Sequence, residues 1–202
     1  MPAAPTERLE RALAATRVLV AAVRDDQWDS PTNCSGWTVR GLVNHLVAGS
    51  DMFVGVLHGA GPPTPEMIAK LRSADRLGDD AAAAYDRSAA ELVAAFGQPD
   101  VLDRIYVVPL GRMPGAGMLH LRVTETLVHG WDLARSTGQP AELPSDLAEE
   151  ELAFARRMIT ADFARTNRFG SEQPVADDAP AIDRLAAFLG RVVTGDPSAA
   201  AN

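Results

Sequence analysis

Residues 122–135 hold the side chains with the clearest capacity for chemistry in this chain. The segment reads Arg122-Val-Thr-Glu125-Thr-Leu-Val-His129-Gly-Trp131-Asp132-Leu-Ala-Arg135, a pattern typical of a helix. Glu125 and His129 are four residues apart, which places both side chains on one helical face about one turn apart. A carboxylate and an imidazole in this arrangement can bind one metal ion if a third ligand comes from elsewhere in the fold.

The helical face that carries this pair should point toward the core. Five of its residues fall within an arc of roughly 100° on a helical wheel: Leu121, Glu125, Val128, His129 and Asp132. Buried glutamate is rare unless it is paired or bound to a metal. Imidazole and carboxylate together suit zinc, nickel, iron or manganese, and the residue types do not choose among these ions.

The residues alone leave other interpretations open. A Glu-x-x-x-His pair also occurs on solvated helix faces, where Glu125 would pair with Arg122 or with an arginine of another helix. Asp132 could accept a hydrogen bond from a metal-bound histidine, or it could pair with Arg135.

His45 is the candidate third ligand. It belongs to the segment Trp37-Thr-Val-Arg-Gly-Leu-Val-Asn-His45-Leu and lies at the margin of the apolar face of a helix predicted over 38–58. A histidine in such a position is also typical of a hydrogen-bonded core or rim residue. His58 and His120 fall in or beside loops and are predicted to lie at the surface.

Composition favours a helical protein and excludes several classes of function. The chain has 202 residues, which suggests one domain over 1–202, and its hydrophobic content is 47% with only 5% aromatic residues, a mixture that favours helices over strands. The formal net charge of −8 argues against nucleic acid and anionic membranes as partners.

No apolar run approaches the ~20 residues of a membrane span, and no signal peptide is apparent, so we expect a soluble cytoplasmic protein. The single cysteine, Cys34, excludes a disulfide framework and is read as a small residue at a turn.

The chain is predicted to fold as an all-α bundle of four main helices and two shorter ones. Helices are predicted over 6–26, 38–58 (capped by Thr38), 66–74, from Asp79 or Asp80 to 96, 116–137 (ended by Gly138), from a Ser145 cap to 160–164, and 181–191. Residues 27–37 are expected to form an ordered loop across a helix end, 101–110 a strand-like connection, 111–117 a turn, and 192–202 a frayed tail. Side chains from facing helices can assemble a metal site in the core of such a bundle.

Two motifs in combination resemble a known family. Trp-x-Val-Arg-x-Leu-x-x-His over 37–45 and Glu-x-x-x-His-Gly-Trp-Asp-Leu-Ala over 125–134 are similar to the DinB-like superfamily, and most closely to the branch related to the N-terminal domain of mycothiol-dependent maleylpyruvate isomerase. Residues 177–191 resemble the ending of a single-domain actinobacterial metal-binding subfamily. The likeness covers residues 6–191.

The resemblance implies a DinB-like four-helix bundle with additional short C-terminal helices and a divalent metal site between helices. Carried over by motif, the metal ligands are His45, Glu125 and His129, with zinc or nickel as the expected ion. Three protein ligands leave open positions for water or substrate, and in the thiol-using branch the metal favours the thiolate of a cofactor such as mycothiol.

Two functions follow from the resemblance. One is a metal-dependent thiol S-transferase or isomerase whose partners are a small-molecule thiol or electrophile, with Arg40 and Arg122 as candidates to hold an anionic group. The other is a non-catalytic metal-binding or ligand-sensing module in which the ion is structural. In the isomerase a separate C-terminal domain contributes to the active site, and the residues after the helix that begins at 145 are too few for it, so isomerisation of maleylpyruvate itself is not expected. Exposed helix faces would allow a homodimer, although the sequence has no clean coiled-coil repeat.

Overall fold

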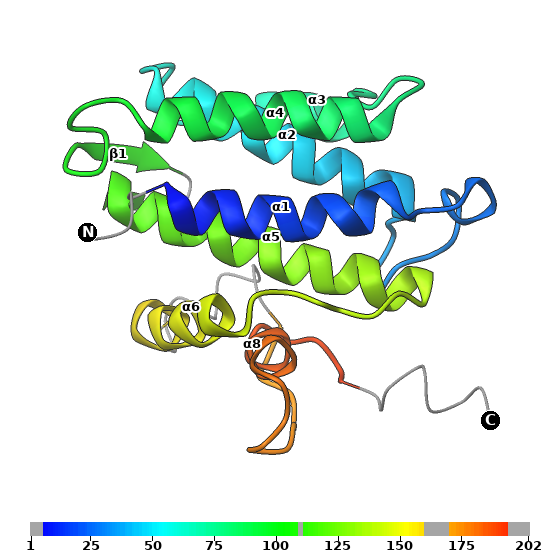
Figure 1. Ribbon diagram of the computed structural model, residues 1–202. Helices are drawn as coiled ribbons and strands as arrows, with labels where there is room; N and C mark the ends of the chain where they lie inside the picture. The colour runs from blue at the N-terminus through cyan, green and yellow to red at the C-terminus, as the bar shows by residue number, and fades with distance from the viewer. Residues whose placement is uncertain (1–5, 109–110, 160–169, 194–202) are drawn as a thin grey trace, which may run out of the picture.

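Four helices pack side by side as a bundle in the computed structural model: α1 (Glu7–Ala21), α2 (Val39–Leu57), α4 (Ala81–Phe96) and α5 (Gly115–Thr137) (Figure 1). The structure describes residues 6–108, 111–159 and 170–193. Helix α2 contacts α4 and α5, and α1 also contacts both of those helices. The predicted all-α, DinB-like four-helix bundle is therefore confirmed.

Local capping explains where α2 and α4 begin and where α5 ends. The Thr38 side chain accepts a hydrogen bond from the backbone N–H of Gly41 at 3.2 Å, and Asp80 accepts one from Ala83 at 2.9 Å, which satisfies otherwise unpaired donors of the first turn. Helix α5 ends at Gly138 in the left-handed conformation, as predicted. The first helix ends at Ala21 and not at residue 26, because residues 25–27 form a separate 3₁₀ turn (η1, Asp25–Gln27).

The predicted turn over 111–117 is wrong, because 111–114 form a strand and 115–117 are the first residues of α5. Residues Ile105–Val108 form strand β1, which pairs antiparallel with β2, Gly111–Pro114, in a register that places Tyr106 opposite Met113. The Val and Tyr side chains favour extended backbone, and the pairing satisfies the backbone N–H and C=O groups of both strands. Residues 109 and 110 lie outside the described part of the chain, and Pro109 with them.

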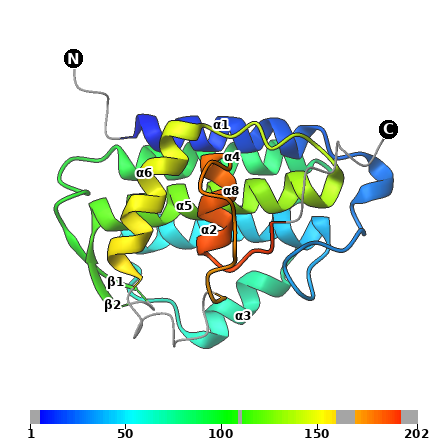
Figure 2. The same cartoon turned by 90° about the horizontal axis from the view of Figure 1, so that it is seen from below.

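Three shorter helices complete the described fold: α3 (Pro65–Ser73), α6 (Ser145–Met158) and α8 (Ala181–Phe188). Helices α6 and α8 pack against each other and against α5, so they cover the α5 surface that the bundle leaves free (Figure 2). Pro144 and not Ser145 is the N-cap of α6. The predicted end at 160–164 lies outside the described residues, as does most of the predicted frayed tail over 192–202.

The C-terminal helix is shorter than predicted. Helix α8 ends at Phe188, and Gly190 then adopts a φ of 90°, a backbone region that side chains disfavour. A Cβ atom at Gly190 would lie 2.5 Å from the Cα atom of Gly170, so only glycine fits this close crossing. The turn directs Arg191 back toward α5, where it reaches Asp132.

Helix α5 is surrounded by other elements, which is why its polar residues are buried. Trp131 and Leu127 are at most 1% exposed, and the indole N–H of Trp131 donates to Asp183 of α8 at 2.6 Å.

Within the described ranges, no helix is long and apolar enough to cross a membrane. The assignment of residues 1–202 to one domain stays a prediction.

Candidate metal centre

The structure brings the three predicted ligands together across the α2–α5 interface. His45 Nε2 lies 3.6 Å from Glu125 Oε2, and His129 Nε2 lies 3.7 Å from the same oxygen. One donor atom from each residue lies within 4.8 Å of the other two. Separations of 3.6 and 3.7 Å are too long for hydrogen bonds, whereas two ligands that hold one ion tetrahedrally at ~2.1 Å are ~3.4 Å apart. The donor set therefore fits a single divalent ion.

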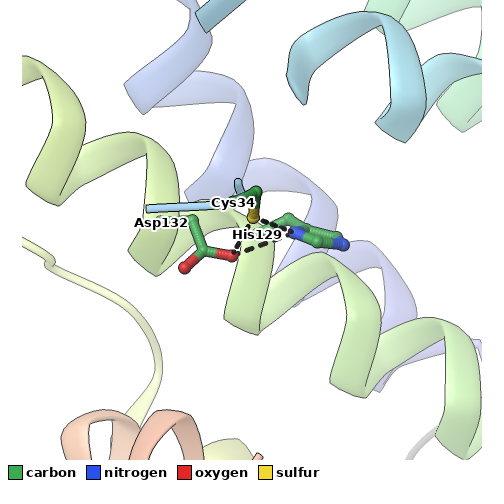
Figure 3. A group of neighbouring side chains, drawn as sticks. All are labelled: Cys34, His129 and Asp132. Atoms are coloured by element: carbon green, nitrogen blue, oxygen red, sulfur yellow. Dashed lines mark hydrogen bonds and ion pairs between the residues drawn. The ribbon is translucent and has the colours of Figure 1, made fainter. Parts of the chain in front are cut away.

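The second ring nitrogen of His129 is held by a buried carboxylate. Nδ1 lies 3.0 Å from Asp132 Oδ2, and Asp132 is fully buried. Figure 3 shows this nitrogen facing Asp132 while the other nitrogen points away. A histidine that donates Nδ1–H to a carboxylate presents a free lone pair at Nε2, and metal-binding histidines usually have such a partner. Of the two roles open for Asp132, the structure places it beside His129, while Arg135 pairs with Asp183 at 3.4 Å.

Cys34 and Arg191 also converge on Asp132, and the sequence pattern indicated neither contact. The Cys34 thiol donates to Asp132 Oδ2 at 3.3 Å and lies 4.0 Å from His129 Nδ1, and Arg191 Nη2 donates to the same oxygen at 3.0 Å. Burial, followed by the Asp132 charge, raises the pKa of Cys34 to about 12, so the sulfur is a protonated donor. A second possible ligand group consists of Cys34, His129 and Asp132. The Asp132 carboxylate, however, already accepts hydrogen bonds from Arg191 and from the Cys34 thiol.

The loop before α2 positions Cys34 and Trp37. Two backbone hydrogen bonds tie it to the first turn of the helix, from Val39 N to Ser30 O at 3.0 Å and from Arg40 N to Trp28 O at 2.9 Å. The Trp37 ring centre lies 4.6 Å from that of His45 and 5.9 Å from that of His129. The expected ordered loop is thus present, and its indole restricts both imidazole rings.

The electrostatic environment favours the metal-binding forms of His45 and Glu125. Burial lowers the pKa of the His45 imidazole, which keeps the ring neutral. Burial by itself would raise the pKa of the Glu125 carboxyl, but the nearby His45, His129 and Arg122 outweigh it and bring the pKa below its usual range. Neutral imidazole and ionised carboxylate are the forms that bind metal.

A cavity of about 1300 Å³ opens at the three donors. Its wall is mainly apolar and includes Met52, Phe53, Leu121 and Val128 together with Arg122 and Arg191. An apolar cavity with a few convergent polar groups is the usual form of a small-molecule site. Ligand positions that the protein leaves free at the metal would therefore face a space large enough for an organic molecule.

The two arginines proposed to hold an anion have different positions. The prediction for Arg40 is wrong, because its guanidinium donates to Asp75 at 2.7 Å and to the carbonyl of Gly78 at 2.9 Å, and the residue does not line the cavity. Arg40 is the second residue of α2, and this start of the helix turns it toward the loop before α4. Arg122 lies in the cavity wall and is only 2% exposed.

The prediction that His120 is a surface residue is only partly right, because its side chain is 18% exposed and makes contacts inside the fold. Its ring stacks on Phe154 at 4.2 Å, and Nδ1 lies 2.9 Å from an oxygen of Glu151, which is fully buried and also accepts from Thr124 at 3.0 Å. Sequence reading missed this pair because Glu151 belongs to a different helix. His58 is exposed, as predicted.

Replacing Asp132 with asparagine should weaken metal binding without abolishing it. Loss of the carboxylate removes the fixed Nδ1–H tautomer of His129, and such partners typically contribute 10- to 100-fold to metal affinity. Competition titration of zinc against a chromophoric chelator measures the change. Asp183→Asn is the matched control, because Asp183 hydrogen-bonds α5 through Trp131 on the side that faces α8. Equal zinc affinity of Asp132→Asn and the wild type would contradict the assigned role.

Comparison with known proteins identifies the family. Residues 9–134 match the family model described as the mycothiol maleylpyruvate isomerase N-terminal domain. Two uncharacterised proteins of Mycobacterium tuberculosis, from strains CDC 1551 / Oshkosh and ATCC 25618 / H37Rv, are each 38% identical over 185 residues, which cover 91% of this chain and 96% of theirs.

Solved structures support the same fold. The crystal structures of mycothiol-dependent maleylpyruvate isomerase and of a histidine-to-alanine mutant of that enzyme each superpose with a TM-score of 0.59 at 19% identity, over 75% of this chain and 68% of theirs. At this identity the superposition establishes the bundle fold. The family match, which contains all three candidate ligands, and the full-length relatives establish more: the chain belongs to the mycothiol maleylpyruvate isomerase N-terminal domain family, the DinB-like branch that its two motifs resemble.

Proposed function

We propose that this protein is a metal-dependent enzyme that uses a low-molecular-weight thiol of the mycothiol type, as an S-transferase or an isomerase acting on a small molecule. His45, Glu125 and His129 would hold a zinc or nickel ion. The observation that carries the proposal is that these three donors converge at the wall of a large cavity. Structural zinc sites are closed by four protein ligands, whereas catalytic sites keep a position open.

Each residue around the site has a defined part in this function. When bound, the ion would supply a Lewis acid that lowers the pKa of a coordinated thiol toward neutrality. Asp132 holds the His129 ring through Nδ1, and Trp37 restricts both imidazoles. The apolar wall around Phe53 would exclude water from the reacting sulfur. A reduced thiol is maintained in the cytoplasm, so the proposal also places the protein there.

The test is binding and transfer of the thiol. Metal-loaded protein, titrated with mycothiol in a calorimeter, should bind it, while chelated protein should not. Incubation with a panel of electrophiles should then consume free thiol faster with metal-loaded wild type than with His129→Ala. Metal-loaded protein that neither binds the thiol nor accelerates its consumption would contradict the proposal.

The non-catalytic alternative predicts a different pattern. An ion that only connects α2 to α5 would enter folding directly, so chelation would lower the melting temperature strongly while thiol binding would be absent in every form. Circular dichroism melts of chelated and reloaded protein, recorded beside the thiol titration, distinguish the two functions.

A further inference from the structure

Arg122 is a buried cation whose surroundings do not account for its charge. The residue is 2% exposed and lies three positions before Glu125 on α5, in the wall of the same cavity. Its guanidinium carbon lies 5.2 Å from the ring centre of Phe53, and Nη2 donates to the Ser50 hydroxyl at 3.2 Å. Both contacts come from α2, so the side chain spans the interface that also holds the candidate metal centre.

No carboxylate of the described residues lies within 4.0 Å of the Arg122 guanidinium, and its Nε atom has no hydrogen-bond partner there. Other largely buried arginines are paired: Arg135 with Asp183 and Arg191 with Asp132. Burial lowers the pKa of Arg122, and Glu125 is the acid whose charge offsets this effect most. If Glu125 binds a divalent ion, the ion neutralises the carboxylate charge, and the Arg122 guanidinium then lacks a compensating anion. A buried charge in that position is costly.

Helix α2 provides the space that the guanidinium needs. A Cβ atom at Gly49 would lie 2.9 Å from Arg122 Nη1, so glycine permits the close approach of the side chain. The planar guanidinium presents several N–H donors in a fork that matches a carboxylate. Around it, Phe53, Met52 and Leu121 form an apolar wall.

We propose that Arg122 binds the carboxylate of an organic monoanion whose apolar part packs on the cavity wall beside the metal centre. This inference rests on the proposed function in one respect, because it takes the cavity as the substrate site. A monoanion is favoured over a phosphate dianion because the only other arginine in the described wall, Arg191, is already paired with Asp132. The substrate class would therefore be a small carboxylic acid that carries the electrophilic centre.

The test uses benzoate as the probe and benzamide as its neutral isostere, with metal-loaded protein, because Glu125 is bound to the ion only in that form. Calorimetry should show that wild type binds benzoate and not benzamide. Arg122→Met should weaken benzoate binding by roughly 10- to 100-fold, the range expected for hydrogen bonds to a charged group. The matched control is Arg135→Met, on the same helix and also stacked on an aromatic ring, but facing α8. It should leave benzoate binding unchanged.

A second measurement separates ligand binding from a structural role. Without ligand, Arg122→Met should melt at the same temperature as wild type or higher, because the substitution removes a poorly compensated buried charge. A marked fall in melting temperature, or benzoate binding equal to wild type, would overturn the proposal. If Arg122→Met does not fold, Arg122→Lys decides: it retains charge and loses the fork, so weaker benzoate binding supports the site and unchanged binding contradicts it.

The outcome is independent of the thiol chemistry. Benzoate binding that depends on Arg122 establishes the anion site even if no thiol binds. Conversely, the protein could transfer the thiol while Arg122→Met binds benzoate as tightly as wild type. The proposed function would then stand, and the proposal that the substrate is a carboxylic acid would be wrong.

Discussion

Alanine at His45, Glu125 or His129 is expected to abolish stoichiometric metal binding in each of the three variants. Structural zinc sites with four protein ligands contribute about 10–16 kcal/mol of binding free energy, so one ligand is worth about 3 kcal/mol, or roughly 150-fold in affinity. The expected loss of metal affinity exceeds the one predicted for Asp132→Asn, because Asp132 orients the ligand His129 and does not bind the ion itself. Elemental analysis of protein purified without an affinity tag, together with zinc competition titration, measures both effects.

His129 also lies beside Cys34 and Asp132, so a control must separate the two groups. Cys34→Ser leaves His45, Glu125 and His129 in place and should retain one equivalent of metal. If Cys34→Ser loses the metal and Glu125→Ala keeps it, the ion lies instead among Cys34, His129 and Asp132, at the Nδ1 side of the His129 ring. Retention of the metal by any one of the three alanine variants removes that residue from the ligand set.

The second large effect is expected at His120, where alanine should destabilise the fold by about 3–5 kcal/mol, the usual consequence of removing one partner of a buried pair. Glu151 is fully buried, and without the imidazole its remaining side-chain hydrogen bond in the described structure comes from Thr124. The stacking contact with Phe154 is lost as well. Urea unfolding at constant pH measures the change in free energy.

His58→Ala is the control for this variant, because His58 is exposed at the end of α2 and should leave the free energy of unfolding nearly unchanged. Glu151→Gln should cost less than His120→Ala, since the amide oxygen can still accept a hydrogen bond and no charge is buried. Equal stability of His120→Ala and His58→Ala would show that the His120–Glu151 contact contributes nothing.

The bundle and the proximity of Glu125 to His129 were predictable because they depend on local signals. Thr38 and Asp80 are polar caps directly before apolar, helix-periodic runs, and Gly138 stops α5 where its periodicity ends. Glu125 and His129 are neighbours on one helix, so their spacing alone determines that they share a face. The third ligand, His45, required the family motif, because nothing in its own helix indicates which helix it faces.

The parts that were missed depend on contacts between elements distant in the chain. Arg191 reaches Asp132 across 59 positions, and only the crossing of Gly170 and Gly190 directs it there. The Glu151 partner of His120 is on another helix, 31 positions away. The sequence predicts a turn where β2 lies because glycine and proline have low strand propensity, which the pairing with β1 overrides.

The two nitrogens of His129 connect the candidate metal centre to the C-terminal segment. One faces Glu125 and the other contacts Asp132, which in turn accepts from Arg191. Thermodynamic coupling is reciprocal, so if docking of Arg191 strengthens metal binding through this imidazole, metal binding must hold Arg191 in place to the same degree. Residues 189–192 also line the cavity. Binding of a metal ion would therefore also stabilise the position of this part of the cavity wall.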